Sequence, residues 1–237
     1  MAPTLRDYQR LKQQRLAAQI PPRDLCYRCW RPGGFCYCAK IRPIGLDLRF
    51  AILIHPLEEK RPIATGRMAH LCLKDSFLIE GDDYSDSAEV NALLADPKND
   101  PAVLFPCEGS TDLSALEPEE RRALFRPGKR PLIFVIDGTW HSARRTMFRS
   151  RNLKNLPCIR FTPAEPSRIR VRHQPDRHCY TTLEAIHQTI DLLTEMPSRP
   201  HDNLLEVMED MVGRQLVFCA ERKPRDEGLR IRRSLLR

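Results

Sequence analysis

The chain has 237 residues, of which 41% are hydrophobic and 30% charged, and its formal net charge is +8. This composition excludes a disordered chain, and the length predicts one to two globular domains whose core needs no disulfides. No apolar run approaches the roughly 20 residues of a membrane helix, and residues 1–20 hold no continuous apolar segment, so neither a membrane span nor a secretory signal is expected. We therefore expect a cytoplasmic protein whose cysteines bind metal rather than form disulfides.

The first predicted element is a helix over residues 5–20, which ends before Pro21-Pro22. A segment rich in Cys, Gly and Pro follows over residues 25–43. Four thiolates in the pattern C-x2-C-x6-C-x-C can converge on one Zn²⁺ in the tetrahedral geometry of closed, structural sites. Four unrelated buried cysteines are the alternative. The pattern predicts a structural zinc site with the ligands Cys26, Cys29, Cys36 and Cys38.

From Leu46 onward, short apolar runs alternate with patterns of helical spacing. The predicted strands cover residues 48–54, 77–80, 102–105, 132–136 and 158–161. The predicted helices cover residues 65–74, 88–94, 139–149, 181–196 and 203–220, and residues 113–125 are predicted to be partly helical around Pro118. This alternation predicts an α/β fold with a mainly parallel sheet, in which ligands bind at the carboxyl ends of the strands.

One block of polar residues stands where the strand over residues 132–136 ends. Its sequence is Asp137-Gly138-Thr139-Trp140, and a predicted helix follows it. The block places a carboxylate, an unhindered backbone and a hydroxyl at the carboxyl edge of the sheet, next to the free N–H groups of a helix start. An ordinary Asp-Gly turn followed by a core tryptophan is the alternative.

The positive charge is concentrated in two parts of the chain. Between Arg144 and Arg177, ten Lys and Arg stand against two acidic residues, and residues 222–237 hold seven against two. Such clusters favour a polyanionic partner, most often nucleic acid, with a solvated basic face as the alternative. Within the first cluster, residues 167–172 read Ser-Arg-Ile-Arg-Val-Arg. Their alternation predicts a strand with three guanidinium groups on one face, suited to phosphate or carboxylate, or else an exposed basic edge strand.

These blocks together resemble the DTW-domain family, which is named for the Asp-x-Thr-Trp motif found here at residues 137–140. The other matching blocks follow in order: His55-Pro56-x-Glu58 with Arg61, Thr65-Gly66-Arg67, Leu104-Phe105-Pro106, Ser167-Arg168-Ile169-Arg170 and Thr181-Thr182-Leu183-Glu184-Ala185. The resemblance covers about residues 25–197 and is closest to the bacterial tRNA-uridine aminocarboxypropyltransferases of that family. Ala64 departs from it, because family members often have Asn before the Thr-Gly-Arg block.

The resemblance implies a SPOUT-like knotted α/β fold with S-adenosylmethionine as co-substrate. It also implies transfer of the 3-amino-3-carboxypropyl group to N3 of a uridine in tRNA, with release of methylthioadenosine. The implied parts are an N-terminal helix and zinc knot over residues 1–45, a catalytic domain over 46–197, and a C-terminal helix and basic tail over 198–237. A SPOUT-type RNA methyltransferase and a non-enzymatic, zinc-containing RNA-binding protein are the alternatives. We expect tRNA as the partner and favour a monomer.

The candidate catalytic residues are Asp137, Thr139 and Trp140. We predict that Asp137 is the base for uridine N3–H or the group that orients it, while capping of the following helix is its structural alternative. We expect the indole of Trp140 to support the loop that carries Asp137.

Two sets of binding residues complete the expectation. The resemblance implies that the co-substrate is bound by Leu104, Phe105, Pro106, Gly109, Ile136, Arg168, Thr181, Thr182, Leu183 and Glu184. The candidate RNA-binding residues are Arg61, Arg67, Arg144, Arg145, Arg170 and Arg172. The division of Arg168 and Arg170 between co-substrate and RNA stays open.

Overall fold

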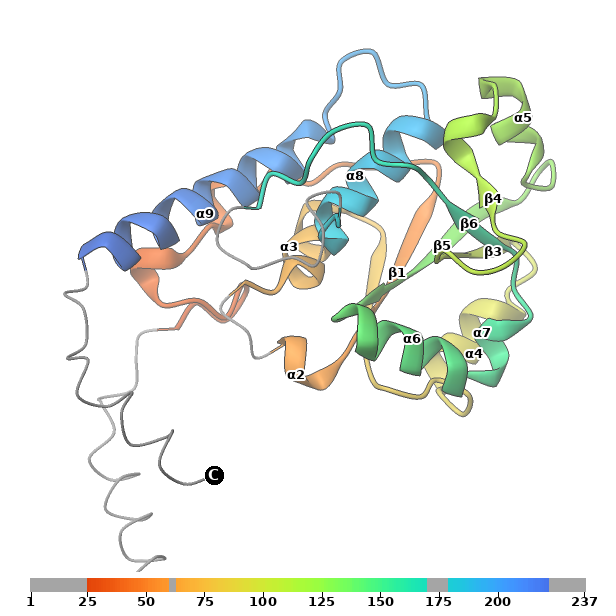
Figure 1. Ribbon diagram of the computed structural model, residues 1–237, viewed down its shortest axis with the longest axis horizontal. Coiled ribbons are helices and arrows are strands. Elements are labelled where there is room, and N and C mark those ends of the chain that lie inside the picture. The colour runs from red at the N-terminus through yellow and green to blue at the C-terminus, as the bar shows by residue number, and fades with distance from the viewer. Residues whose placement is uncertain (1–24, 60–62, 170–178, 222–237) are drawn as a thin grey trace, which may run out of the picture. The chain divides into compact units, whose positions relative to one another are not determined.

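A computed structural model of the chain describes residues 25–59, 63–169 and 179–221 (Figure 1). The predicted N-terminal helix and the basic tail lie outside these residues, as do Arg61, Arg170 and Arg172. The chain divides into two compact units, Met1–Cys36 and Tyr37–Arg237. In the first unit, Leu25 and Pro32 form an antiparallel bridge and a 3-10 helix covers Gly33–Phe35.

The second unit contains a six-stranded sheet in the order β2-β1-β5-β3-β6-β4, and every strand pairing is parallel. Its strands are β1 (Arg49–Ile54), β2 (Ser76–Glu80), β3 (Asn99–Leu104), β4 (Thr111–Asp112), β5 (Arg130–Asp137) and β6 (Cys158–Arg160). The central strands β1 and β5 are near-continuous apolar runs, as expected for parallel strands covered on both faces. The predicted α/β fold with a mainly parallel sheet is confirmed.

Helices cover both faces of this sheet. Those on one side are α3 (Thr65–Cys72), α8 (Thr182–Leu193) and α9 (Asp202–Glu221), which contact one another (Figure 1). The opposite side carries α4 (Ala88–Ala95), α6 (Trp140–Arg149) and α7 (Arg151–Lys154). The remaining helices are α2 (Pro56–Glu59), α5 (Pro118–Ala123) and the 3-10 helices Cys38–Lys40 and Leu113–Ala115. None of the described helices is long and apolar enough to cross a membrane.

Alternate residues of the central strands point to the two helical layers. Leu53 and Phe134 belong to a buried cluster that includes Val90 of α4 and Met147 of α6. Their strand neighbours, such as Ile133, are fully buried as well, and side chains alternate between the faces of a strand. Both faces are therefore apolar, and polar groups are left to the strand ends.

The structure differs from the predicted elements in one place that matters for the site. Residues 167–169 form no strand: Ile169 is buried, while the Ser167 hydroxyl and the Arg168 N–H donate to the Glu184 carboxylate of α8. In the described part of this segment, one apolar side chain is therefore anchored in the interior and no sheet edge forms. Residues 113–125 are partly helical around Pro118, as predicted: a 3-10 helix covers Leu113–Ala115, and Pro118 starts α5 at its first position.

Candidate active site and metal centre

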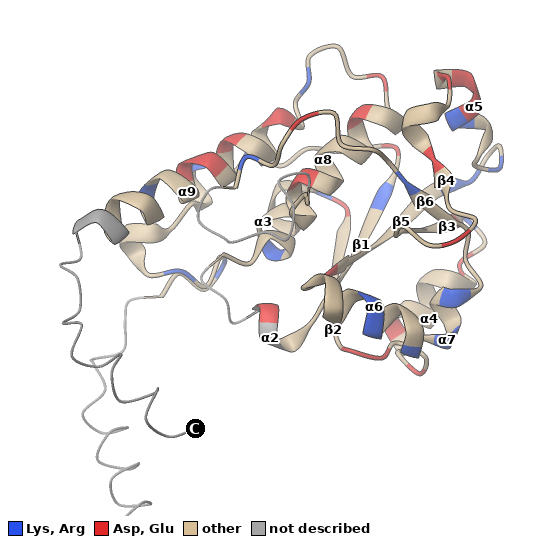
Figure 2. Ribbon diagram, viewed as in Figure 1, with Lys and Arg blue, Asp and Glu red and all other residues tan. Residues whose placement is uncertain are grey.

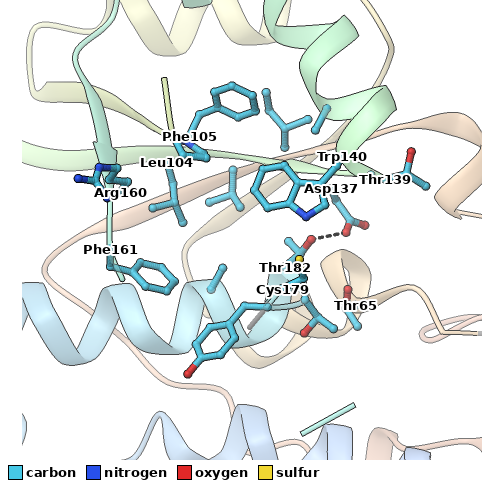
Figure 3. Close-up of a pocket in the computed structure, with 18 of the residues that line it drawn as sticks. Thr65, Leu104, Phe105, Asp137, Thr139, Trp140, Arg160, Phe161, Cys179 and Thr182 are labelled. Carbon is cyan, nitrogen blue, oxygen red and sulfur yellow. Dashed lines mark hydrogen bonds between the residues drawn. The ribbon is translucent and has the colours of Figure 1, made fainter. Parts of the chain in front are cut away.

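A cavity of about 630 Å³ opens at the carboxyl ends of β3, β5 and β6 (Figure 3). Its walls come from the residues that follow these strands and from the first residues of α3, α6 and α8. This is where parallel α/β sheets bind ligands, and the volume suits a small organic molecule. The polar and aromatic residues used below are Thr65, Phe105, Asp137, Trp140, Arg160, Phe161, Tyr180 and Thr182.

Asp137 is the last residue of β5 and lines this cavity with a side chain that is almost fully buried. Its carboxylate accepts a hydrogen bond from the Thr182 hydroxyl at the start of α8 (Figure 3). Its backbone carbonyl accepts the N–H of His55, at the end of the neighbouring strand β1. Thr182 therefore fixes the carboxylate, while His55 fixes the backbone that carries it.

The N-terminal turn of α3 packs directly against this carboxylate. A Cβ atom added to Gly66 would lie 2.5 Å from Asp137 Oδ2 and 2.7 Å from its Cγ. Only glycine allows this approach without a shift of either element. Helix N-termini carry partial positive charge, and the starts of α3 and α8 bring this charge next to the Asp137 carboxylate.

The other residues of the Asp-Gly-Thr-Trp block have different roles. Thr139 is the N-cap of α6: its hydroxyl accepts the Ser142 N–H at 3.2 Å and bonds the Ser142 hydroxyl at 3.0 Å. The helix cap is therefore Thr139, not Asp137, which leaves the carboxylate available to the cavity. Trp140 is 42% exposed and lines the cavity, so its indole is not the core side chain of the alternative interpretation.

The structure brings some of the predicted co-substrate residues to this cavity and not others. Those that line it are Leu104, Phe105, Pro106, Ile136, Thr181 and Thr182. Gly109, Arg168, Leu183 and Glu184 are not among the lining residues: Gly109 forms an exposed turn with φ 75°, and Leu183 is fully buried in α8. Glu184 is buried, and its carboxylate accepts hydrogen bonds from the Thr181 N–H, the Ser167 hydroxyl and the Arg168 N–H.

Arg160, at the end of β6, is a cavity residue that the sequence analysis did not single out. It is the one basic side chain among the described residues that line the cavity. Its guanidinium forms an ion pair with the Asp112 carboxylate, with 2.9 Å between nitrogen and oxygen. Arg168, which was expected to bind an anion here, pairs instead with Glu209 of α9 at 3.0 Å. Ligands bind at the carboxyl ends of parallel strands, and this rule, which indicated Asp137, also applies to Arg160 and Phe161 at the end of β6. Phe161 packs against Tyr180 with ring centroids 5.7 Å apart.

The predicted RNA-binding arginines that the structure describes lie on different surfaces. Arg67 is half-buried on α3, whereas Arg144 and Arg145 are exposed on α6. Helices α6 and α7 carry five Lys and Arg and no acidic residue, while acidic residues line α9 (Figure 2). Arg145 and Arg149 both pair with Asp82, at 3.1 and 2.9 Å. Among the described residues, α6 and α7 therefore form a basic surface next to the cavity wall that Trp140 lines.

The four cysteines of the N-terminal pattern do come together. One sulfur atom from each of Cys26, Cys29, Cys36 and Cys38 lies within 4.8 Å of the others, so the cluster could hold a metal ion. The Cys29 and Cys36 sulfurs are 3.7 Å apart, which matches the separation of about 3.8 Å between sulfurs bound tetrahedrally at 2.3 Å from zinc. Backbone N–H groups of Cys29 and Arg28 lower the pKa of the Cys26 thiol to about 6, which favours the thiolate that binds metal.

In a second group of side chains that could bind metal, an arginine of the protein neutralises the negative charge of the carboxylates. His187, Asp191 and His201 lie close together where α8 and α9 meet. The Arg199 guanidinium donates to Asp191 at 2.7 Å and to Asp202 at 3.0 Å, so the positive charge that a metal would supply is present. Burial lowers the pKa of His187, and its Nε2 lies 2.8 Å from Asp202 Oδ1. This cluster ties α8 to α9.

Comparison with known proteins adds three named relatives. The tRNA-uridine aminocarboxypropyltransferase 2 of Mus musculus is 26% identical over 203 residues, which is 84% of this chain and 66% of the mouse protein. The proteins of the same name from Drosophila melanogaster and Macaca fascicularis are 29% and 24% identical, over 75% and 84% of this chain and 70% and 66% of their own lengths. This chain therefore spans about two thirds of the relatives' length. These relatives are animal proteins, so the expected bacterial likeness stays a prediction. No solved structure matches the chain significantly.

The DTW domain model matches residues 23–216, which include the cysteine cluster, the cavity and most of α9. This match covers far more than half of the chain and contains every sequence block on which the resemblance depended. The chain belongs to the DTW-domain family.

Proposed function

We propose that this protein transfers the 3-amino-3-carboxypropyl group of S-adenosylmethionine to N3 of a uridine in tRNA. The observation that carries the proposal is the position of Asp137: the carboxylate of the family motif lines a strand-end cavity and is fixed by Thr182. The names of the three relatives support the same reaction. The SPOUT-type knot, the monomeric state and the cytoplasmic location stay predictions.

The cavity fits S-adenosylmethionine in chemistry as well as in size. Its aromatic residues, Phe105, Phe161 and Tyr180, suit an adenine ring, and Arg160 suits the carboxylate of the amino-acid part. The carboxylate of Asp137 suits the neighbourhood of a sulfonium, which carries positive charge. When bound, the co-substrate supplies the group: the bond from uridine N3 to carbon forms as the carbon–sulfur bond breaks and methylthioadenosine leaves.

Within this reaction, Asp137 holds the uracil and accepts the N3 proton. Uridine N3 is a poor nucleophile until that proton is removed, so a carboxylate in hydrogen-bond reach of N3–H is required. Thr182 donates to Asp137 and fixes its orientation, while Gly66 allows the α3 N-terminus to close over it. Trp140 is exposed enough at the cavity wall to contact the incoming base. These residues bind and orient the base and move its proton.

The basic surface of α6 and α7 is the proposed site of tRNA backbone contacts. Replacing Arg144 and Arg145 by Ala should weaken tRNA binding and reduce its salt dependence, because fewer counterions are released on binding. Co-substrate affinity should stay nearly unchanged, since neither side chain lines the cavity. Titration of tRNA at several salt concentrations measures the first effect, and calorimetry with S-adenosylmethionine measures the second. An unchanged affinity and salt slope would place the tRNA surface elsewhere.

We propose that the cysteine cluster binds one structural Zn²⁺ through Cys26, Cys29, Cys36 and Cys38. Purified protein should contain about one equivalent of zinc per chain, and Cys29→Ser should lose it, because Cys29 is a buried ligand. Cys72→Ser is the matched control, since Cys72 is a buried cysteine of α3 outside the cluster. Elemental analysis together with thermal unfolding tests this, and well-folded protein without zinc would contradict it.

Nucleoside mass analysis tests the proposed reaction. Unmodified tRNA incubated with the protein and S-adenosylmethionine should yield a uridine that is heavier by one aminocarboxypropyl group, together with methylthioadenosine. Reactions without protein, and with Asp137→Asn, are the controls. A tRNA of unchanged nucleoside composition would contradict the proposal.

A further inference from the structure

The first two cysteines of the cluster lie in a short loop that backbone hydrogen bonds close. The Cys26 carbonyl accepts the Trp30 N–H at 2.7 Å, and the Cys26 N–H donates to the Arg31 carbonyl at 2.8 Å. The bridge between Leu25 and Pro32 closes the loop at its base. Residues 27 to 30 therefore project from a fixed turn, and two of them, Tyr27 and Trp30, are large aromatics.

These two aromatic side chains face solvent. Tyr27 is 96% exposed and Trp30 is 52% exposed, whereas Cys29 between them is buried. Trp30 also has a φ of 58°, in the left-handed region that bulky residues disfavour. Strained backbone conformations cluster at binding sites, and here the strain presents an aromatic side chain that leaves half of its surface to solvent.

The positive charge around the loop indicates a negatively charged partner. Residues 25–42 contain four Lys and Arg and no acidic residue. Lys40 and Arg42 pair with Asp210 and Glu206 of α9, and the Arg31 guanidinium lies over the Phe35 ring, so the exposed cation next to Tyr27 is Arg28. Arg28 is exposed, and no acidic side chain in the described part of the chain pairs with it. Exposed aromatic rings interleaved with guanidinium groups are the chemistry that binds unpaired nucleotides.

We propose that the loop Cys26–Arg31 is a base-stacking surface, on which Tyr27 and Trp30 stack unpaired bases of RNA while Arg28 contacts the phosphate backbone. The inference rests on the proposed function only in taking tRNA as the RNA. It assigns to the cysteine cluster a binding role beyond folding. Stacking on a ring is tolerant of sequence, so this surface gives affinity for single-stranded regions and not the choice of the modified uridine.

The test measures binding of fluorescently labelled oligouridine and of unmodified tRNA to the full-length protein. Tyr27→Leu keeps an apolar side chain but removes the ring, and should weaken both affinities by about 5- to 150-fold. Tyr27→Phe keeps the ring and should bind like the unsubstituted protein. The salt slope should be the same in all three proteins, because stacking releases no counterions. Zinc content measured on each variant shows whether the loop is intact.

The two tryptophans of the chain, Trp30 and Trp140, allow a direct spectroscopic readout. Trp30→Phe keeps a ring at position 30, so the emission of the unsubstituted protein minus that of Trp30→Phe isolates Trp30, and oligouridine should quench this difference along the same titration curve. Equal RNA affinity of Tyr27→Leu and the unsubstituted protein, with zinc bound and no quenching of Trp30, would overturn the inference. Nucleoside mass analysis of the same tRNA separates the two proposals: a modified tRNA with binding independent of Tyr27 refutes only the stacking surface. Binding dependent on Tyr27 without modification refutes only the proposed reaction.

Discussion

Replacing Asp137 by asparagine is expected to lower the rate of transfer to tRNA by about 10²–10⁴-fold, the usual contribution of a general base. The amide oxygen can still accept the hydrogen bond from Thr182, so the shape of the cavity wall should persist. An amide cannot accept the uridine N3 proton, however, and the chemical step should fail. Single-turnover transfer rates and calorimetric binding of S-adenosylmethionine measure the two expectations separately.

Two variants of Thr182 provide the control for this expectation. Thr182→Ser retains a hydroxyl that can donate to Asp137 and should keep most of the transfer rate, whereas Thr182→Val removes the donor and should lose more. Because Thr182 acts through Asp137, the pH dependence of transfer should move in Thr182→Val and stay in place in Thr182→Ser. If Asp137→Asn lowers the transfer rate by less than tenfold, the carboxylate orients the uracil and does not take its proton.

Replacing Gly66 by alanine is expected to damage the site although Gly66 bears no functional group. The added Cβ would lie 2.5 Å from Asp137 Oδ2, so either the carboxylate or the N-terminus of α3 must shift. Displacing a reacting group by about 1 Å can cost about 10²-fold in rate, and overpacking costs about 1–3 kcal/mol in the free energy of unfolding. Transfer rate and denaturant unfolding of the same variant measure both effects.

Gly213→Ala is the matched control, because Gly213 lies in α9 and a Cβ there meets nothing within 4 Å. In a helix interior this change should stabilise the protein by about 0.5–1 kcal/mol without altering transfer. If Gly66→Ala keeps full activity and stability, the close packing of α3 on Asp137 is not required.

The fold was predictable from the sequence where apolar patterning alone decides the structure. The buried runs of β1 and β5 and the spacing in α8 and α9 identified these elements within a few residues. The two-residue strand β4 was not predictable, because its pairing with β6 depends on the tertiary arrangement. The strand expected over residues 167–172 is wrong for its described part, because Glu184, distant in sequence, captures the backbone there.

The site was predictable to the extent that its residues stand at strand ends. Asp137 met that rule and was found; Arg160 met the same rule, but the Arg-rich segment after it carried the more conspicuous pattern. Sequence pattern could not show that Arg168 would pair with Glu209 of α9, since that contact depends on how two helices and a loop pack. Nor could it show that Thr139, and not Asp137, caps α6.

Labelled co-substrate tests the central claim most directly. S-adenosylmethionine carrying one label on its methyl group and a different label on its carboxyl carbon should transfer only the carboxyl label to tRNA, with the methyl label recovered in methylthioadenosine. A SPOUT-type methyltransferase would give the reverse, and an RNA-binding protein without enzymatic activity would transfer neither label. Methyl label in the modified uridine would contradict the account.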